Sequence, residues 1–375
     1  MNDQDLIYNL ALTRLTGFNF QLSVQLYRQL GGGRGVYDHR HDMRSVLPEC
    51  SPRLAAVLSD WSQPLARAEQ ELQFIERHHI QVLCLDQPDY PQRLAHCDDA
   101  PIVLFYMGTA SLNAQRVVSI VGTRRATAYG QDLIRHLVSD LRRCCPQLLV
   151  VSGLAYGVDI CAHRQALSEG LPTVGVLAHG LDELYPPRHR ETARQMLQQG
   201  GLLTEYMTNT NADKLNFVKR NRIVAGMADA TVLIESAAHG GGLITCRLAR
   251  EYGRQVLAYP GPVNATYSEG CNNLIRDNGA QLISSADDLV AALGWQSDKE
   301  LQAAQQKGIE RQLFPTLTAD EQHVVSLLNA RGDMQLNMLT AESGLSIGQL
   351  TAVLFQLEMK GVVRPMAGGC YHLLV

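Results

Sequence analysis

The stretch Val117-Val-Ser-Ile-Val-Gly-Thr-Arg-Arg125 decides the fold of this chain. Five residues typical of a buried β-strand lead into a glycine turn, a hydroxyl and two arginines, and a helical pattern starts at Thr127. This is the order of the first strand, first turn and first helix of a nucleotide-binding-type α/β domain. Because open α/β sheets bind ligands at the carboxyl ends of their strands, the two arginines predict an anionic ligand.

Length and composition describe a globular chain of two or three domains. The chain has 375 residues, of which 46% are hydrophobic and 19% charged, and no apolar run is long enough to span a bilayer. The first residues, Met-Asn-Asp-Gln-Asp, lack the basic segment of a signal peptide. Nine cysteines occur without a C-x-x-C pair, which favours reduced thiols and no metal site. We expect a cytoplasmic protein with no cofactor and no membrane partner.

Net charge limits the kind of anion site that the chain can hold. The formal charge is −4, from 33 basic and 37 acidic residues. A non-specific nucleic-acid binder is often basic over its whole sequence. Any polyanion site in this chain therefore has to be a local patch.

Residues 1–62 have the leucine spacing of packed helices and are expected to form the first domain. Gly17 separates two helical patterns, and a run of three glycines at 31–33 ends the second. Helix, glycine turn and helix is the order of a SAM-like or helix-hairpin-helix module. Such a hairpin usually has a second glycine where this chain has Asn19. That difference favours a packing module over backbone contact with a phosphate.

Residues 63–295 alternate between short apolar strands and helices and are expected to form the second domain. Two short strands, at 80–85 and 101–106, precede the stretch that decides the fold. The strands expected after it lie at 148–151, 173–177, 201–204, 230–234 and 255–258. Strands that alternate with helices predict a parallel sheet with right-handed crossovers. Because these strands are apolar throughout, both faces of the sheet should be covered.

Residues 296–315 have the composition of a linker, and residues 316–375 are expected to form a winged-helix-like domain. Thr318 and Ser346 stand where helix caps are expected, and a hairpin is expected around Gly368-Gly369. This last domain carries three basic and five acidic residues, net −2. A helix that reads duplex DNA needs more positive charge, so protein contact is the favoured hypothesis for this domain over binding of duplex DNA.

The turn after the first strand, Gly122-Thr123-Arg124-Arg125, combines free backbone amides at a helix start with a hydroxyl and guanidinium groups. That combination suits a phosphate. Alternatively, Gly122 only makes a tight turn and the arginines pair with carboxylates. We favour the phosphate, and of the two arginines we favour Arg124, with Arg125 as its structural neighbour.

The second strand ends in a similar turn that starts at Ser152 and Gly153. Asp159, six positions after Gly153, either orients a ligand or interacts with the dipole of the following helix. His163 lies one turn further along and is expected to be structural. No pair of residues here has the pattern of a nucleophile and its base.

A dense basic cluster, Lys219-Arg220-Asn221-Arg222, lies on an expected helix at 216–227. On a helix these four side chains spread around the surface, so not all of them can face one ligand. A solvated face is the simpler interpretation. The apolar residues that follow, 223–226, indicate that the helix packs closely on the sheet, which favours a functional patch with at least one arginine held in place.

A third glycine turn, Gly240-Gly241-Gly242, opens an expected helix at 243–252, again a geometry that favours anions. Arg247, Arg250 and Arg254 follow at a spacing that predicts one basic stripe. Several enzyme motifs are absent from the sequence: there is no P-loop, no H-E-x-x-H, no G-x-S-x-G and no strict G-x-G-x-x-G after the first strand. We therefore expect a binding protein and no catalytic residues.

Taken in order, these pieces resemble the DNA-processing protein A family, also called DprA or Smf. The matching segments are residues 119–125 (Ser-Ile-Val-Gly-Thr-Arg-Arg), 151–163, 176–182 with 185–187, Phe217 with 220–223, 230–235, 253–254 with 260–261, and 270–275. They cover residues 115–285 without a break in order. The two outer domains match in general type only.

The resemblance implies an extended Rossmann-like fold and a homodimer without enzymatic activity. It implies that the protein binds and protects incoming single-stranded DNA in natural transformation, passes the strand past single-strand-binding protein and loads a RecA-type recombinase. The basic residues that line the family's DNA pocket correspond to Arg124, Arg220 and Arg222, with Lys219 and Arg125 as neighbours. Tyr156 and Phe217 are the nearest aromatic residues that could stack on bases.

A second hypothesis is a nucleotide sensor or a nucleotide hydrolase on a related Rossmann-like domain. Those hydrolases combine a glycine-rich turn with a catalytic glutamate and arginine. Glu235 and the turn Gly240-Gly241-Gly242 have a faint similarity to that arrangement. Binding of nucleotides without binding of oligonucleotides would favour this hypothesis.

Overall fold

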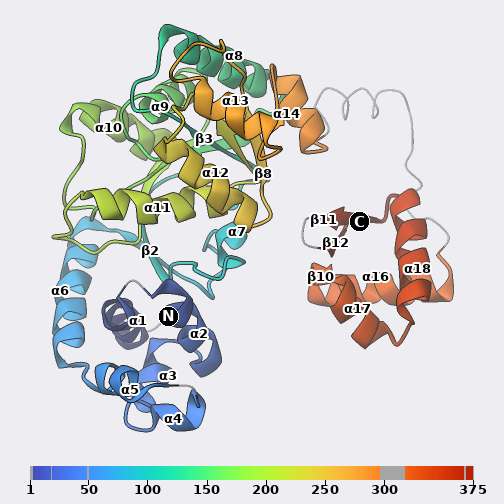
Figure 1. Ribbon diagram of the computed structural model, residues 1–375. Coiled ribbons are helices and arrows are strands. Elements are labelled where there is room, and N and C mark those ends of the chain that lie inside the picture. Colours follow the sequence, from blue (N-terminus) through green and yellow to red (C-terminus); the bar gives the residue numbers. More distant parts are fainter. Residues whose placement is uncertain (1–2, 18, 49, 296–316, 367–368, 375) are drawn as a thin grey trace. The chain divides into compact units, whose positions relative to one another are not determined.

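The computed structural model describes residues 3–17, 19–48, 50–295, 317–366 and 369–374, and Figure 1 shows their arrangement. The chain divides into two compact units, Met1–Ser297 and Asp298–Val375. The expected linker, residues 296–315, lies outside the described residues. Among those described, no helix has both the length and the apolar character needed to cross a bilayer.

The described residues of the first unit contain one nine-stranded sheet in the order β1-β2-β6-β5-β4-β3-β7-β8-β9. The strand bounds are Gln81–Cys84, Val103–Gly108, Arg116–Val121, Leu148–Ser152, Thr173–Val176, Gly201–Thr204, Ala230–Leu233, Gln255–Ala258 and Gln281–Leu282 for β1 to β9. From β6 to β9 all neighbours are parallel, as predicted. At the other edge, β2 pairs antiparallel with both β1 and β6.

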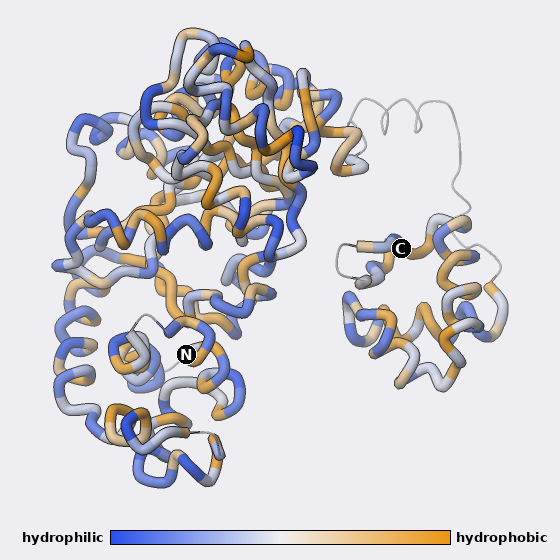
Figure 2. The backbone as a smooth tube through the Cα atoms, viewed as in Figure 1, coloured by the Kyte–Doolittle hydropathy of each residue, from blue (hydrophilic) through white to orange (hydrophobic). Residues whose placement is uncertain are grey.

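Helices cover both faces of this sheet, and β3 shows how the sequence produces that. Val118 and Ile120 pack against α8 (Ala128–Cys144), α9 (Val158–Ser168) and α14 (Ala286–Ala292). Val117 and Val121 belong to the core on the other face, beneath α11 (Lys214–Gly226), α12 (Gly241–Glu251) and α13 (Glu269–Arg276). Alternate residues of a strand point to opposite faces, so a strand apolar at every position is buried on both sides. Figure 2 shows this apolar interior below more polar helix surfaces.

The N-terminal helices pack on the antiparallel edge of the sheet and share its core. Their bounds, with the short helix that follows β1, are α1 Asp3–Thr16, α2 Phe20–Leu30, α3 Gly33–Asp38, α4 Met43–Val46, α5 Pro52–Ser59, α6 Ser62–His78 and α7 Gln92–Ala95. The side chain of Asn19 accepts from the backbone N–H of Leu22 and caps α2. Across the sheet edge, the Tyr27 hydroxyl donates to Asp86 at 2.8 Å. Asn19 thus has a structural use, and the boundary at residue 62 stays a prediction.

The second unit has the helices and hairpin of a winged helix. Its elements are α16 Ala319–Arg331, β10 Met334–Gln335, α17 Leu336–Ser343, α18 Ile347–Met359, β11 Val363–Met366 and β12 Cys370–Leu373. Thr318 and Ser346 each form a capping box with the third residue of the helix that follows, as expected. The predicted hairpin is present as the antiparallel pair β11 and β12, and β10 adds a third strand beside β12.

Candidate functional site

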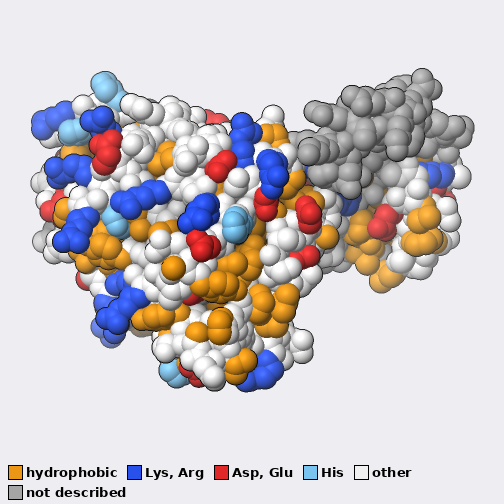
Figure 3. Space-filling model, turned by 90° about the horizontal axis from the view of Figure 1, so that it is seen from above, with side chains coloured by type: hydrophobic (Ala, Val, Ile, Leu, Met, Phe, Trp, Pro, Cys, Tyr) orange, Lys and Arg blue, Asp and Glu red, His pale blue; other side chains and the backbone are white. Residues whose placement is uncertain are grey.

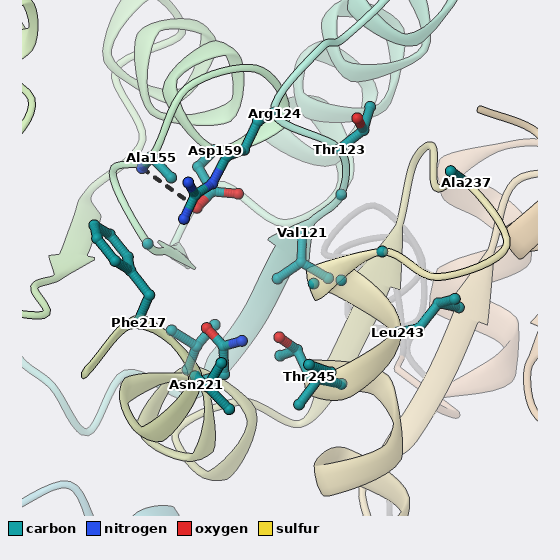
Figure 4. Close-up of a pocket in the computed structure, with 18 of the residues that line it drawn as sticks. Val121, Thr123, Arg124, Ala155, Asp159, Phe217, Asn221, Ala237, Leu243 and Thr245 are labelled. Atoms are coloured by element: carbon teal, nitrogen blue, oxygen red, sulfur yellow. Dashed lines mark hydrogen bonds between the residues drawn. The ribbon is translucent and has the colours of Figure 1, made fainter. Parts of the chain in front are cut away.

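The site lies where the strand order of the sheet reverses. The chain runs from β3 to β4 on one side and returns to β7 on the other side of β3. Loops from adjacent strands diverge at such a switch point and leave a crevice at the carboxyl edge of the sheet. Here they enclose a cavity of about 910 Å³, lined by the turns after β3, β4 and β7 and by α11 and α12 (Figure 4).

The turn after β3 is fixed by close backbone packing at Gly122. A Cβ at this position would lie 2.6 Å from a methyl group of Val158 and 2.8 Å from the carbonyl oxygen of Glu235. The next residue, Thr123, donates its N–H to that same carbonyl at 2.8 Å, and its own carbonyl accepts from Val158 N–H at 3.1 Å. The turn is therefore held between the end of β7 and the start of α9, so that the following arginines leave a rigid base.

Arg124 extends from this turn over the ring of Phe217 on α11. Its guanidinium carbon lies 4.9 Å from the ring centroid, a cation–π distance. Figure 4 shows the Arg124 side chain between Phe217 and Asp159. Arg124 is exposed, so its guanidinium keeps donors for a ligand.

Arg220, by contrast, is buried in the floor of the cavity. It is 3% exposed. Its Nη1 donates to the carbonyl of Gly153 at 2.6 Å and also to that of Val176. Its Nε has no hydrogen-bond partner within the described parts of the chain. Arg220 therefore places a fixed positive charge in the floor of the cavity, and a side chain at residue 153 would displace it, since a Cβ there would lie 2.4 Å from its Nη2.

The charge of the cavity is strongly positive although the chain is acidic overall. Five basic side chains line it, and the one carboxylate among the lining residues is Asp159; the basic ones are Arg124, Arg125, Lys214, Arg220 and Arg247. Asp159 is 9% exposed and accepts from the backbone N–H of Ala155 at 3.4 Å. Burial raises the pKa of the Asp159 carboxyl, and the positive charge of Arg220 and the backbone N–H of Ala155 oppose that rise. The expected local patch is present.

The third wall of the cavity is the N-terminus of α12. Gly240 is the N-cap residue, and Gly241 and Gly242 form the first turn. Gly242 packs closely against the turn that follows β3, because a Cβ on Gly242 would lie 3.2 Å from the Cα of Gly122. Free N–H groups at a helix start attract anions, so this wall suits a phosphate.

The structure brings most of the predicted site residues to this one cavity. Those that line it are Gly122, Thr123, Arg124, Arg125, Gly153, Arg220, Asn221, Gly240, Gly241, Gly242 and Arg247. Three others do not line it: Ser152, Lys219 and Arg222. The Ser152 hydroxyl is buried and donates to the carbonyl of Ile120 at 2.6 Å, which joins β4 to β3.

The placement of Arg222 corrects the expectation drawn from the basic cluster. Arg222 is 3% exposed, and its guanidinium donates to Glu205 and to the carbonyl of Asp99. The same group lies 3.7 Å from the ring centroid of Phe20 on α2. Arg222 therefore ties the N-terminal helices to the sheet, away from the cavity. Lys219, which directly precedes Arg220 on α11, is partly exposed outside the cavity.

The predicted stripe of three arginines on α12 is wrong as a single surface. Of the three, Arg247 lines the cavity, where its Nε lies 3.6 Å from the carboxylate of Glu251. Arg254 instead donates to the carbonyl of Arg93 at 2.6 Å. It follows α12 and is drawn toward α7, so helical spacing no longer applies to it.

The cavity residues outside the predicted set include two polar side chains that the sequence did not single out, Lys214 and Tyr267. Lys214 is the first residue of α11, two positions before the expected start of that helix. The signal was Asp213, whose side chain accepts from the N–H of Asn216 and caps the helix. Tyr267 lies in a loop and carries no periodic pattern that could place it.

His163 has the structural role that was expected. It is fully buried and its Nδ1 lies 2.7 Å from the hydroxyl of Thr173. Burial, together with the nearby charges of Arg220 and His189, lowers the pKa of His163 to about 3. The ring is therefore neutral at physiological pH.

Figure 3 shows Lys and Arg side chains at several places on the face that it presents, with acidic and hydrophobic side chains exposed among them. No three His, Cys, Asp or Glu side chains of the described residues are grouped as metal ligands would be.

Fold and site together define a class: a Rossmann-like α/β protein with a winged helix, whose sheet edge holds a positively charged cavity. Residues 81–294 match the family described as DNA recombination-mediator protein A, and residues 310–369 match the DprA winged helix domain. The chain belongs to the DNA recombination-mediator protein A family.

Individual relatives agree with that assignment. The chain is 33% identical to Protein Smf of Synechocystis over 331 residues, which cover 80% of this chain and 82% of that protein. Among solved structures, it is similar to DNA processing protein A from Streptococcus pneumoniae, with a TM-score of 0.65 and 29% identity over 76% of this chain and 97% of that one. It is also similar to DNA processing protein A from Helicobacter pylori, whose structure is described in terms of its single-stranded DNA binding mode. That match has a TM-score of 0.51 and 28% identity, and it covers 57% of this chain and 95% of the other.

Proposed function

We propose that this chain binds single-stranded DNA independently of sequence, through the cavity at the carboxyl edge of its sheet. The observation that carries the proposal is the arrangement of Arg124, Phe217 and the start of α12 around one opening. Arginine and helix amides suit the phosphates of a strand, and the ring of Phe217 suits a base. The described binding of single-stranded DNA by the Helicobacter pylori relative supports the same ligand.

Membership of the family supports a cellular role for the protein. We propose that the protein acts in the cytoplasm as a homodimer, protects incoming single strands during natural transformation and loads a RecA-type recombinase on them in competition with single-strand-binding protein. A protein with this role needs affinity for the backbone without sequence readout. Phosphate contacts have that property, and they also make binding sensitive to salt.

The alternative of a nucleotide hydrolase is weakened by the position of Glu235. This glutamate is 3% exposed, and its carboxylate accepts from the backbone N–H of Thr127 at 2.8 Å and from its hydroxyl at 2.6 Å. It is thereby bound to the start of α8 and is not among the cavity-lining residues. A general base has to reach the reacting atoms, and Glu235 does not.

For the winged helix we propose contact with a protein. On α18 the exposed apolar side chains are Ile347, Phe355 and Met359. The Lys360 ammonium that follows them lies 2.6 Å from Glu321 and is paired with it. A surface that reads duplex DNA is rich in unpaired positive charge, whereas this one is apolar.

The test is a titration of the full chain with labelled single-stranded and double-stranded oligonucleotides of equal length at two salt concentrations, beside a panel of mononucleotides. We expect the single strand to bind more tightly than the duplex, with little dependence on sequence and a strong loss of affinity at the higher salt. Tight binding of a mononucleotide, followed by its hydrolysis and without oligonucleotide binding, would favour the alternative.

A further inference from the structure

An exposed tyrosine stands directly beside the cavity without lining it. Tyr185, in the loop between β5 and η1 (Pro187–His189), is 45% exposed. Its ring centroid lies 5.8 Å from that of Phe217, and the two rings are inclined by 62°. Since Phe217 itself lies under Arg124, the three side chains form a continuous row that starts inside the cavity and ends outside it.

The backbone below this tyrosine is fixed by a buried histidine. The N–H of Tyr185 donates to Nε2 of His179 at 3.1 Å, and Nδ1 of His179 lies 2.8 Å from the carbonyl oxygen of Gly180. These two contacts require one tautomer, in which Nδ1 carries the proton and Nε2 accepts. His179 is 1% exposed. The loop therefore presents the ring of Tyr185 from a rigid base, although the ring itself faces solvent.

The hydroxyl of Tyr185 has no hydrogen-bond partner among the described residues, so no polar contact accounts for the position of the ring at the surface. A large aromatic side chain that is half exposed, rigidly held and adjacent to a basic cavity has the properties of a stacking platform. Base–aromatic stacking is tolerant of sequence, since every base has a flat face.

We propose that Tyr185 is a second base-stacking position, so that the strand leaves the cavity across Phe217 and Tyr185 over the loop between β5 and η1. This inference rests on the proposed function. One base lies in the cavity against Phe217, and the next lies on Tyr185. Because the two rings are inclined by 62°, bases that lie flat on each cannot remain stacked on one another, and the strand bends between them.

Leu215 supplies a control for the loss of an exposed apolar side chain. It lies on α11, is 67% exposed and has no ring. If binding depended only on the amount of exposed apolar surface, removal of Leu215 would matter as much as removal of the Tyr185 ring. If the surface binds bases, only the flat ring matters.

The experiment measures binding of the full chain and its variants Tyr185→Leu, Tyr185→Phe and Leu215→Ala to a thymidine oligonucleotide, and to versions with one abasic site moved along the strand. We expect Tyr185→Leu to weaken binding by roughly 5- to 150-fold, the range of one lost stacking contact, without a change in salt dependence. Tyr185→Phe and Leu215→Ala should stay within about twofold of the unaltered chain on the same scale. At one abasic position, the unaltered chain should bind more weakly than it binds the intact oligonucleotide. Tyr185→Leu should bind that abasic strand and the intact strand equally well.

Failure of the inference is distinguishable from failure of the proposed function. If the unaltered chain shows no salt-sensitive binding of single strands, the proposed function is wrong. If the unaltered chain binds single strands and Tyr185→Leu binds them equally well, only the stacking position is wrong. The same conclusion holds if the unaltered chain and Tyr185→Leu lose the same affinity as each other at every abasic position. A change of sedimentation in Tyr185→Leu with unchanged DNA binding would assign the surface to protein contact and overturn the inference.

Discussion

Arg220 and Arg222 lie two positions apart on α11, yet their guanidinium groups lie on opposite sides of the helix. Arg220 bonds to the carbonyls of Gly153 and Val176 in the floor of the cavity, whereas Arg222 bonds to Glu205 beneath the N-terminal helices. Two helical positions differ by about 200° around the axis, so one helix delivers a charge to each side. One arginine of the Arg-Asn-Arg sequence belongs to the site and the other to the core.

We therefore expect Arg222→Met to affect stability and not DNA binding. The substitution leaves Glu205 buried without its partner, and breaking a buried ion pair in this way costs about 3–5 kcal/mol. The double variant Arg222→Met with Glu205→Leu should be less destabilised, because no unpaired charge remains. Urea unfolding followed by tryptophan fluorescence measures this effect, since Trp61 and Trp295 both belong to the first unit. Equal destabilisation of the single and double variants would contradict the pairing.

Replacement of Arg124 tests the phosphate contact, and Arg125 provides its matched control. Both side chains are exposed on the same turn, but Arg124 lies over Phe217. We expect Arg124→Ala to weaken binding of all sequences similarly and to lower the salt slope by ~0.7 to 1, the value of one lost phosphate contact. Arg125→Ala should change the slope less. Fluorescence anisotropy at several salt concentrations measures both, and equal slopes for the two variants would refute the assignment.

Gly153→Ala tests the position of Arg220 without removing its charge. A Cβ at residue 153 would lie 2.4 Å from Nη2 and 2.6 Å from Nη1 of Arg220, so the guanidinium has to move. We expect a loss of about 1–3 kcal/mol in stability, as for other overpacked sites, together with weaker binding of single strands. Gly348→Ala on α18, where a Cβ meets nothing within 4 Å, is the control. It should leave DNA binding unchanged and should raise stability by about 0.5–1 kcal/mol, because alanine is more favourable than glycine in a helix. Wild-type affinity in Gly153→Ala would show that Arg220 is not a ligand-facing charge.

The sequence was sufficient for the elements that depend on local patterns. Residues 117–125 predicted β3, its turn and the helix after it, because a run of buried β-type residues and a glycine are adjacent in the chain. The parallel order followed from strands alternating with helices. The sequence predicted β1 and β2 as strands but did not predict that they pair antiparallel. In β2, Phe105 pairs with Thr204, and no local pattern joins residues so far apart in the chain.

Residues that line the cavity could be predicted where they belong to a turn at the end of a strand. They could not be predicted where they lie on a helix. The turn alone was enough to place Gly122 and Arg124 at the carboxyl edge of the sheet, where the cavity lies. The helix positions 219, 220 and 222 could not be assigned, because a basic cluster does not show which face of its helix meets the sheet. Tyr185 stood in one of the segments that resemble the family, but no sequence pattern gave it a role, because the proposed role depends on the ring of Phe217 on a different element.

The protonation of Asp159 is expected to make the affinity for single-stranded DNA depend on pH. Its buried carboxylate faces the same cavity as the ligand phosphates and repels them, while Arg124, Arg220 and Lys214 attract them. Burial raises the pKa of Asp159, so the carboxyl takes up a proton at a higher pH than an exposed aspartate does, and a bound phosphate favours that protonation. Affinity for single strands should therefore increase as pH falls.

Asp159→Asn is expected to bind single strands roughly tenfold more tightly near neutral pH, which corresponds to about 1.4 kcal/mol of like-charge repulsion removed. Its affinity should also vary less between neutral and mildly acidic pH than that of the unaltered chain, because the titrating carboxyl is gone. His239 also lines the cavity, so His239→Gln is the control that separates the two groups. Anisotropy titrations over this pH range measure the effect. If Asp159→Asn keeps the full pH dependence and His239→Gln loses it, the carboxylate is not the titrating group; if Asp159→Asn binds more weakly, Asp159 holds the arginines in place instead of opposing the ligand.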